Sequence, residues 1–290
     1  MANLRDVRLR MRAIRQTLQV TKAMNLISTS KLRRGRRALQ DMEPFFTRIQ
    51  KSMIDILSGA GKVQSEYFVP MKRNDVHHTA IIAVTSDKGL AGGYNSGIFR
   101  HVSQLCEKTG NPVLIPVGSI GYRHFLHSPW MIMENYSFNS GIPETDNAAE
   151  IAGYIISQYL GGTFDEVHIV YTHMYSPVKL LPVTRQLLPL DLSKLQDEFS
   201  SFGEKRVKLQ FEYYPSKDEV FDALVPFYIR GIIYGALIEA YAAEQSARMA
   251  AMDEASKNAE EMLADLQIYY NRVRQAGITQ EMSEIIGGSL

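Results

Sequence analysis

A hydrophobic seam at alternating steps of three and four residues, running from residue 4 to residue 56, most constrains how this chain can fold. A heptad pattern of this length is typical of a long helix that packs along another helix. Asn3 can cap the start of this helix, and Asp6 lies near the positive end of its dipole. The members of the seam are Leu4, Val7, Met11, Ile14, Leu18, Thr21, Asn25, Ser28, Leu32, Gly35, Leu39, Met42, Phe46, Ile49, Met53 and Ile56.

Two features disturb this seam. Thr21, Asn25 and Ser28 place three polar side chains in its middle, which weakens the packing and favours a surface that can slide or swivel. Pro44 lacks the N–H that an interior helical position needs, so we expect the helix to kink or to break locally there.

The C-terminal region has a similar pattern. Ser216 and Glu219 have the spacing of a capping box that begins a helix, and Pro226 predicts a bend shortly after it. The glycine pair 287–288 is expected to end the helix. Two successive seams follow Pro226: first Ile229, Ile233, Ala236, Ala240, Ala243, Ala247 and Ala250, and then Met252, Ala255, Ala259, Met262, Leu266, Tyr269, Val273 and Ala276.

The middle of the chain alternates short apolar runs with helix-like segments. The runs 79–85, 112–118 and 166–172 predict parallel strands, and a helix is expected at about 146–160. The segments 178–188 and 209–214 could add antiparallel edge strands, and 193–208 is expected to be a loop. The sequence therefore predicts an α/β protein in which a long antiparallel coiled coil of N- and C-terminal helices accompanies a Rossmann-like α/β middle domain.

This organisation divides the chain into four segments: an N-terminal coiled-coil helix over 1–57, a linker over 58–77, the α/β domain over 78–215 and a C-terminal coiled-coil helix over 216–290. If the two helices pair, they must be antiparallel. At about 1.5 Å per residue the first spans roughly 80 Å and the second roughly 100 Å. We therefore expect the C-terminal helix to extend past its partner from about residue 272.

Charge and cysteine content narrow the function. Residues 1–57 hold 13 Lys and Arg against 4 Asp and Glu, whereas residues 217–290 hold 6 against 12, so the two ends attract each other. Cys106 is the only cysteine, so an intrachain disulfide is excluded and a reducing compartment is favoured. We expect no signal peptide, because arginines interrupt the N-terminal region, and no membrane span, because no run of about 18 uninterrupted apolar residues occurs.

Four segments in this order resemble the gamma subunits of F-type ATP synthases. They are 21–24 (TKAM) with 30–34 (SKLRR), 85–95 (TSDKGLAGGYN), 244–252 (EQSARMAAM), and 270–281 (YNRVRQAGITQE) continuing to Glu284, Ile285 and Ile286. Any one segment is weak by itself, but all four at this spacing are specific. The resemblance covers essentially the whole chain.

The resemblance implies a central rotor subunit that couples ion-driven rotation of the c ring to ATP synthesis or hydrolysis in the beta subunits. The expected partners are three alpha and three beta subunits, epsilon and the c ring, with one copy of this chain per complex. The chain itself would carry no catalytic site, cofactor, metal or nucleic acid, and would meet the membrane only through the c ring. Its expected location is the cytoplasmic face of the bacterial plasma membrane.

The resemblance also implies site residues. Those expected to contact the alpha/beta ring are Lys22, Met24, Lys31, Arg33, Arg34, Lys88, Arg248, Arg274, Gln275, Thr279 and Glu281. Tyr213 and Tyr214 fall in the segment expected to face the c ring, although an aromatic edge strand is an equal interpretation of that segment. An apolar stripe of Ile278, Met282, Ile285 and Ile286 would need a sleeve supplied by the ring.

Other interpretations remain open at this point. The basic run from Lys31 to Arg37 could be a solvated helix face or the nucleic-acid patch of a coiled-coil adaptor. The loop 87–95 is glycine-rich, but it lacks the ending of a P-loop and the spacing of a dinucleotide fingerprint, so a nucleotide-dependent enzyme is not favoured. His124 and His127 could share a helix face, yet no third metal ligand accompanies them. Neither alternative explains the extended C-terminal tip.

Overall fold

The computed structural model describes residues 4–59, 62–68, 77–138, 141–191 and 212–287. Two long helices, α1 (Leu4–Ser58) and α6 (Lys217–Gly287), lie at the two ends of the chain. The chain forms two compact units. We call residues 1–30 and 248–290 the helix-pair unit, and residues 31–247 the sheet unit.

In the helix-pair unit, α1 and α6 run antiparallel, so Arg8 meets Tyr270 and Thr21 meets Ser256. The seam of α1 is confirmed, because its members in this unit are buried or half-buried. The second seam of α6 was wrong at Met262, Tyr269 and Ala276, which are exposed, and the last member of the first seam, Ala250, is exposed too. In place of Met262 and Tyr269, the inward positions belong to Leu263 and Tyr270, one residue later. Ser256 and Ala259 are both buried against α1 and fix which face of α6 points inward. Counting on from them at steps of three and four leads to Leu263 rather than to Met262.

In the sheet unit, both long helices continue through their prolines, so of the two outcomes expected at Pro44, a kink or a local break, the break does not occur. Packing of Phe46, two residues after Pro44, supports the continuous helix. Phe46 stacks on Tyr228 with 5.7 Å between ring centroids, and Gly231 leaves space for the Phe46 ring that a Cβ atom would fill. These contacts hold the helix across the hydrogen bond that proline cannot donate. Leu39 is the member of the α1 seam that is exposed.

The sheet has five strands: β1 (Thr79–Val84), β2 (Pro112–Val117), β3 (Met131–Ile132), β4 (Glu166–Met174) and β5 (Leu180–Leu188). Their order is β3-β2-β1-β4-β5. Strands β1 to β4 pair in parallel, and β5 pairs antiparallel with β4. The expected Rossmann-like arrangement is confirmed, and its switch point lies between β1 and β4.

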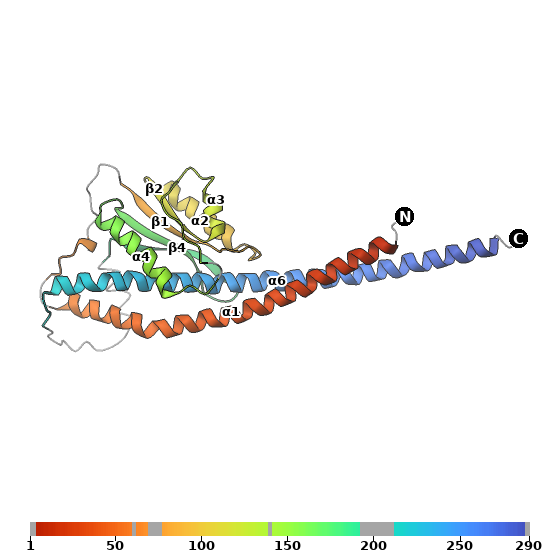
Figure 1. Cartoon of the computed structure of the whole chain (residues 1–290), viewed down its shortest axis with the longest axis horizontal. Helices are drawn as coiled ribbons and strands as arrows, with labels where there is room; N and C mark the ends of the chain where they lie inside the picture. The colour runs from red at the N-terminus through yellow and green to blue at the C-terminus, as the bar shows by residue number, and fades with distance from the viewer. Residues whose placement is uncertain (1–3, 60–61, 69–76, 139–140, 192–211, 288–290) are drawn as a thin grey trace. The chain divides into compact units, whose positions relative to one another are not determined.

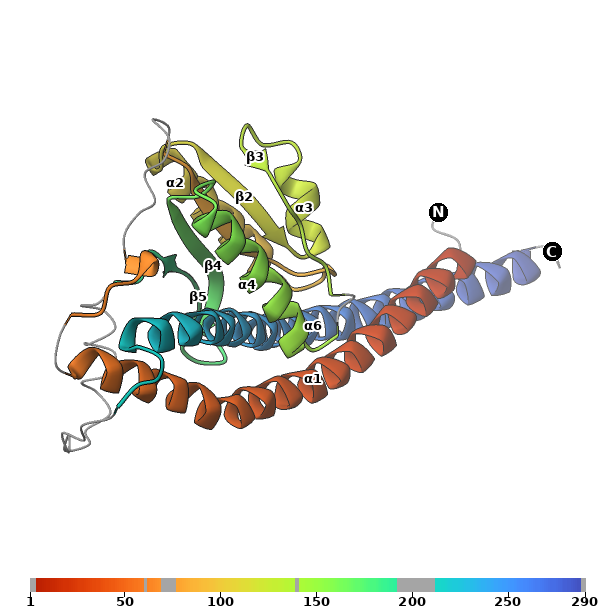
Figure 2. The ribbon, with the colours of Figure 1, turned by 60° about the vertical axis from the view of Figure 1, so that its left-hand side comes forward.

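Helices cover both faces of this sheet (Figures 1 and 2). On one face lie α2 (Tyr94–Lys108) and α3 (Ser119–Phe125), with Ile98, Val102 and Phe125 buried against Ile81 and Leu114. On the other lie α4 (Thr145–Leu160) and the sheet-unit portions of α1 and α6. A short 3-10 helix, η1 (Glu66–Phe68), follows α1 and buries Tyr67.

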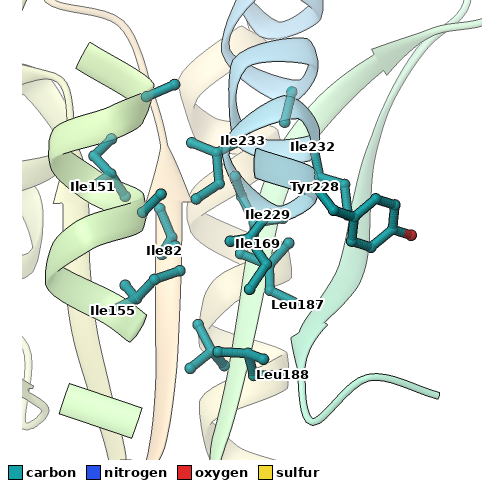
Figure 3. Packing of buried hydrophobic residues seen from close by; sticks show 14 of the residues in the cluster. Ile82, Ile151, Ile155, Ile169, Leu187, Leu188, Tyr228, Ile229, Ile232 and Ile233 are labelled. Carbon is teal, nitrogen blue, oxygen red and sulfur yellow. The ribbon is translucent and has the colours of Figure 1, made fainter. Parts of the chain in front are cut away.

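The larger core lies between the sheet, α4 and α6 (Figure 3). Ile82 and Ile169 of the sheet meet Ile151 and Ile155 of α4, and Ile229 and Ile233 of α6 lie close to the same strands. All six side chains are fully buried. Each contributes about 1.5–3 kcal/mol by leaving water, so α6 is an integral part of the sheet unit.

The start of α6 follows the expected capping pattern. The Ser216 hydroxyl accepts the Glu219 N–H at 3.2 Å and donates to the Glu219 carboxylate at 3.0 Å. An edge strand was possible at 209–214, but residues 212–214 form no strand. Residues 209–211 and the expected loop 193–208 lie outside the described residues.

One helix, α6, contains an 18-residue window that is long and apolar enough to cross a membrane by length and composition alone. This is weak evidence, because half of that window is buried inside the protein and a core helix passes the same test. Ile229 and Ile233, which belong to the core described above, show where the apolar side chains of α6 go.

Candidate docking surfaces

The polar middle of the helix pair is joined by hydrogen bonds. The hydroxyl oxygens of Thr21 and Ser256 lie 2.7 Å apart, and the Asn25 amide donates to the Met249 carbonyl at 3.1 Å. The Thr29 hydroxyl approaches the Met249 sulfur at 3.3 Å. The expected polar interruption of the seam is therefore present, and two of its members, Thr21 and Asn25, form hydrogen bonds across the pair.

Lys22 forms an ion pair within the chain. Its Nζ lies 2.6 Å from Glu260 Oε1, and both side chains are more than half exposed. An exposed pair of this kind is worth about 0.2–1 kcal/mol, so another carboxylate can replace Glu260 at small cost. Met24, two residues later, is half-buried.

Arg248 differs from the other expected ring contacts, because its side chain is buried within the chain and 7% exposed. A buried guanidinium has to be paired, and this one takes part in interactions inside the molecule. Arg248 is therefore poorly placed to meet a second protein in this conformation.

The C-terminal end of α6 extends past the described start of α1, within the helix-pair unit (Figure 1). Arg274, Gln275 and Thr279 are exposed there, and the Thr279 hydroxyl donates to the Gln275 carbonyl at 2.9 Å. Ile278 and Met282 are 52% and 58% exposed. Glu281 is helical, but its side chain and those of Ile285 and Ile286 lie outside the description.

The basic run in the sheet unit has an inner and an outer side. Leu32 and Gly35 are buried, and a Cβ on Gly35 would lie 3.2 Å from the Tyr241 ring. Lys31 is half-buried, whereas Arg33 and Arg34 are exposed. The run therefore combines a packed seam with an accessible cationic face.

The loop after β1 is a rigid turn. The Ser86 N–H donates to Asn95 Oδ1 at 3.1 Å, and the Asn95 amide donates back to the Ser86 hydroxyl at 2.7 Å. Leu90 and Gly92 have φ values of 63° and 55°. Among the glycines of this loop, Gly92 adopts a positive φ, whereas Gly93 has a φ of −81°. Lys88 is exposed on this loop.

The carboxyl edge of the sheet is filled by the chain's own polar groups. Asp87 Oδ1 accepts from the Ser119 N–H at 2.8 Å and from the Ser137 hydroxyl at 2.7 Å, and its Oδ2 accepts from the Phe138 N–H at 3.3 Å. The Thr85 hydroxyl accepts from the Gly121 N–H at 3.0 Å. In dinucleotide-binding folds such N–H groups receive phosphate. Here a carboxylate occupies them and would repel phosphate, which argues against the nucleotide-dependent enzyme.

The two tyrosines of the expected c-ring segment have different environments. Tyr213 packs on the core of the sheet unit, where burial and the nearby Asp55 carboxylate raise the pKa of its phenol. Tyr214 is 94% exposed. Tyr214 is therefore the one of the pair that presents a full side chain to solvent.

The histidines form no metal site in the part of the chain that the structure describes. The ring of His124 stacks on Phe99 with 3.8 Å between centroids. Burial, helped by nearby His127, lowers the pKa of His124 and favours its neutral form. His124 is thus explained by packing.

Sequence reasoning missed Thr85, Asp87 and Ser246. The Ser246 hydroxyl donates to the Pro177 carbonyl at 3.1 Å and ties the β4–β5 turn to α6. A signal was available only for Asp87, as an acidic residue in the loop that follows a buried strand.

The chain is similar to known proteins over its whole length. Residues 3–290 match a family described as ATP synthase. The ATP synthase gamma chain of Acetivibrio thermocellus is 38% identical over 291 residues, covering 100% of this chain and 99% of the relative. That of Ruminiclostridium cellulolyticum is 40% identical over 288 residues, covering 99% and 98%. A sodium ion specific gamma chain from Acetobacterium woodii is 34% identical, covering 99% and 98%.

Two solved structures share the fold. A chain of the Euglena gracilis mitochondrial ATP synthase (OSCP/F1/c-ring) superposes with a TM-score of 0.66 at 17% identity, covering 99% of this chain and 93% of that one. A chain of the Tetrahymena thermophila mitochondrial ATP synthase central stalk and c-ring gives 0.60 at 23% identity, covering 82% and 99%.

Proposed function

Because the chain belongs to the ATP synthase gamma chain family, the central-stalk subunits of F-type ATP synthases, we propose that it couples c-ring rotation to the catalytic sites of the beta subunits. The paired helices act as the rotating shaft inside a ring of three alpha and three beta subunits. ATP chemistry takes place in the beta subunits, and this chain contributes no catalytic group.

The observation that carries this proposal is the end of α6. The contact between Arg8 and Tyr270 sets the register of the helix pair, so the residues after about 275 extend past the described start of α1. Ile278 and Met282 are exposed on this end. Apolar side chains on a helix without a neighbouring helix are stabilised by an outside sleeve, which the upper alpha/beta ring supplies.

The proposed contacts with the ring are transient ion pairs and hydrogen bonds. Lys22, Arg33, Arg34 and Lys88 carry exposed cations, and Arg274, Gln275 and Thr279 are exposed near the tip. Weak, screened pairs suit a rotor, because each can be exchanged as the shaft turns. Lys31, Met24 and Glu281 extend these surfaces, and Arg248 joins them only after its side chain leaves its buried position.

The sheet unit is the proposed foot of the rotor. We assign Tyr214, with Tyr213 behind it, to the c-ring contact and expect epsilon to bind the same unit. The functional segments are those expected from the sequence: helix 1–57, linker 58–77, domain 78–215 and helix 216–290. One copy serves each complex, at the cytoplasmic face of the plasma membrane.

The test is co-purification of the tagged chain with alpha and beta subunits, followed by an ATPase assay with and without the chain. The proposal predicts an assembly containing one copy of this chain and ATPase activity that depends on it. A chain that ignores alpha and beta subunits but binds DNA in a salt-dependent manner would instead support the nucleic-acid adaptor.

A further inference from the structure

Part of the segment expected to be a linker, residues 62–68, packs against the sheet unit, and we call it the strap. Tyr67 is buried in the larger core, and the Phe68 ring packs on the buried Phe221 of α6 with 5.1 Å between centroids. The Ser65 hydroxyl accepts the Tyr67 N–H at 3.2 Å, and the Ser65 carbonyl accepts the Phe68 N–H at 3.3 Å. The strap therefore has a defined conformation of its own.

Hydrogen bonds join the strap to the first two turns of α6. The Gln64 N–H donates to Asp218 Oδ1 at 3.1 Å, and the Ser65 hydroxyl donates to Asp222 Oδ1 at 2.5 Å. Burial, and next the Asp222 carboxylate, raise the pKa of the Tyr67 phenol, which places this carboxylate beside the strap. Hydrogen bonds to a carboxylate are stronger than bonds between neutral groups, so the strap is firmly held.

The same two turns of α6 are joined to the ends of β5 and α1. The Leu190 N–H, shortly after β5, donates to the Tyr67 carbonyl of the strap at 2.7 Å. A Cβ atom on Gly59 would lie 3.3 Å from Lys217 Nζ, so this ammonium lies at the C-terminal end of α1. A cation there favours the helix dipole, and α1 has no basic residue in its own last turn. Three elements thus meet at the base of α6.

This base directly follows the segment that we assign to the c ring. Only Pro215 and Ser216 separate Tyr214 from Lys217, the first residue of α6. A force applied at Tyr214 therefore enters α6 through its first turns. The end of a helix opens more readily than its interior, because its terminal backbone groups lack intrahelical partners. Contacts that hold these turns to the rest of the sheet unit oppose that opening.

We propose that Ser65 and Asp222 are positioning residues that brace the base of α6 against the strap and the end of β5. The brace makes the sheet unit and α6 turn together when force enters at the c-ring segment. Both residues act through α6 rather than by touching another subunit. This role rests on the proposed function above. Without the contact between Ser65 and Asp222, the base of α6 yields under load, and ATP hydrolysis loses part of its link to ion transport.

Three variants and one control separate this role from a general loss of stability. Asp222→Ala removes the acceptor and Ser65→Ala removes the donor, whereas Asp222→Asn keeps an oxygen that can accept from the Ser65 hydroxyl. The matched control is Asp146→Ala. Asp146 is also an acidic residue near the start of a helix of the sheet unit, but it is exposed on α4 and lies outside the strap contacts.

Hydrogen exchange of the Leu190 amide reports opening of the strap, because this N–H donates to the Tyr67 carbonyl. In the assembled complex, Asp222→Ala should accelerate this exchange by roughly tenfold or more, the effect of losing one hydrogen bond to a charged group. Asp146→Ala should leave it unchanged. An exchange rate in Asp222→Ala equal to that of wild type would overturn the brace.

Ion pumping per ATP in reconstituted vesicles tests the role in coupling. Asp222→Ala and Ser65→Ala should each lower this ratio, and the double variant should lower it no further, because all three remove the same contact. Asp222→Asn should restore most of the loss. A merely structural role would lower ATPase and pumping in the same proportion; that result would overturn the brace and leave the proposed function intact. Failure of the wild-type complex to pump with ATP would overturn the proposed function itself.

Discussion

The hydroxyl oxygens of Thr21 and Ser256 lie 2.7 Å apart between α1 and α6, and each also lies within hydrogen-bond distance of a carbonyl of its own helix. Thr21 is 3.1 Å from the Leu18 carbonyl, and Ser256 is 2.8 Å from the Met252 carbonyl. Two hydroxyl hydrogens cannot serve three contacts at once. One of the two hydroxyls therefore donates across the pair and does not donate to the carbonyl of its own helix.

This competition predicts weak coupling between the two residues. In a double-mutant cycle of Thr21→Val and Ser256→Ala, we expect a coupling free energy below about 1 kcal/mol, because each remaining hydroxyl returns to its own helix. The measurement is urea unfolding of the four proteins. A coupling of about 2 kcal/mol or more would mean that the hydrogen bond locks the pair, which contradicts a surface that can adjust.

The ion pair of Lys22 with Glu260 separates a role inside the chain from a role toward the ring. Lys22→Glu should cost about 0.5 kcal/mol of stability at most, because the pair is exposed, but it should impair ion pumping per ATP in reconstituted vesicles. Arg34→Glu should have the same effect on pumping. The double variant Lys22→Glu with Glu260→Lys restores the intrachain pair, yet we expect pumping to remain impaired.

The matched control for that swap is Asp253→Lys with Lys257→Glu. This pair is similarly exposed, with 2.9 Å between Lys257 Nζ and Asp253 Oδ2, and is assigned no contact. Its exchange should leave pumping unchanged. Full recovery of pumping in the Lys22/Glu260 swap would remove Lys22 from the ring contacts.

Two buried threonines should respond to the same substitution in opposite directions. Thr85 Oγ1 donates to the Val117 carbonyl at 2.8 Å and accepts from the Gly121 N–H, whereas Thr172 Oγ1 is buried with no hydrogen-bond partner among the described residues. Thr85→Val should cost roughly 1–3 kcal/mol, and Thr172→Val should gain about 1 kcal/mol. Urea unfolding measures both. Equal losses would show that Thr172 has a partner that its surroundings do not reveal.

Asp165 makes the free energy of unfolding depend on pH in the acidic range. Burial alone would raise the pKa of this carboxyl, but hydrogen bonds from His77 at 2.8 Å and the His78 N–H at 2.9 Å, with the charges of those histidines, lower it on balance. A lowered folded-state pKa stabilises the fold above the unfolded value of about 3.9 and ceases to do so as the pH falls through the folded value.

We therefore expect the difference in free energy of unfolding between wild type and Asp165→Asn to shrink as the pH falls below about 4. Urea unfolding between pH 3 and pH 7 measures it, with the exposed Glu107→Gln as control. A difference that is the same at every pH would show that the Asp165 carboxylate does not carry this dependence.

The fold was predictable because its periodicities are strong. The α1 seam, the three parallel strands and the helix at 145–160 all repeat apolar residues at the spacing of their element. The errors came where packing decides. At Met262 and Tyr269 the sequence offered apolar residues one step away from Leu263 and Tyr270, and alanine-rich surroundings did not distinguish the two seams.

The candidate site was less predictable, because a linear pattern does not show which side chains meet. Nothing in the sequence indicated that Lys22 faces Glu260, that Arg248 is buried, or that Asp87 holds the N–H of Ser119. The exposure of Val178 was not predicted for the same reason, because the sequence placed this residue in a possible edge strand over 178–188. These features depend on contacts between residues far apart in the chain.

The most direct measurement is rotation of single complexes. Gln104 is exposed on α2, so Gln104→Cys can carry a bead, while buried Cys106 leaves the wild-type chain unlabelled as the control. With alpha and beta subunits fixed to a surface, the account predicts that ATP drives unidirectional rotation of the bead. Active complexes in which the bead stays still, or only fluctuates without direction, would contradict the assignment of this chain as the rotating shaft.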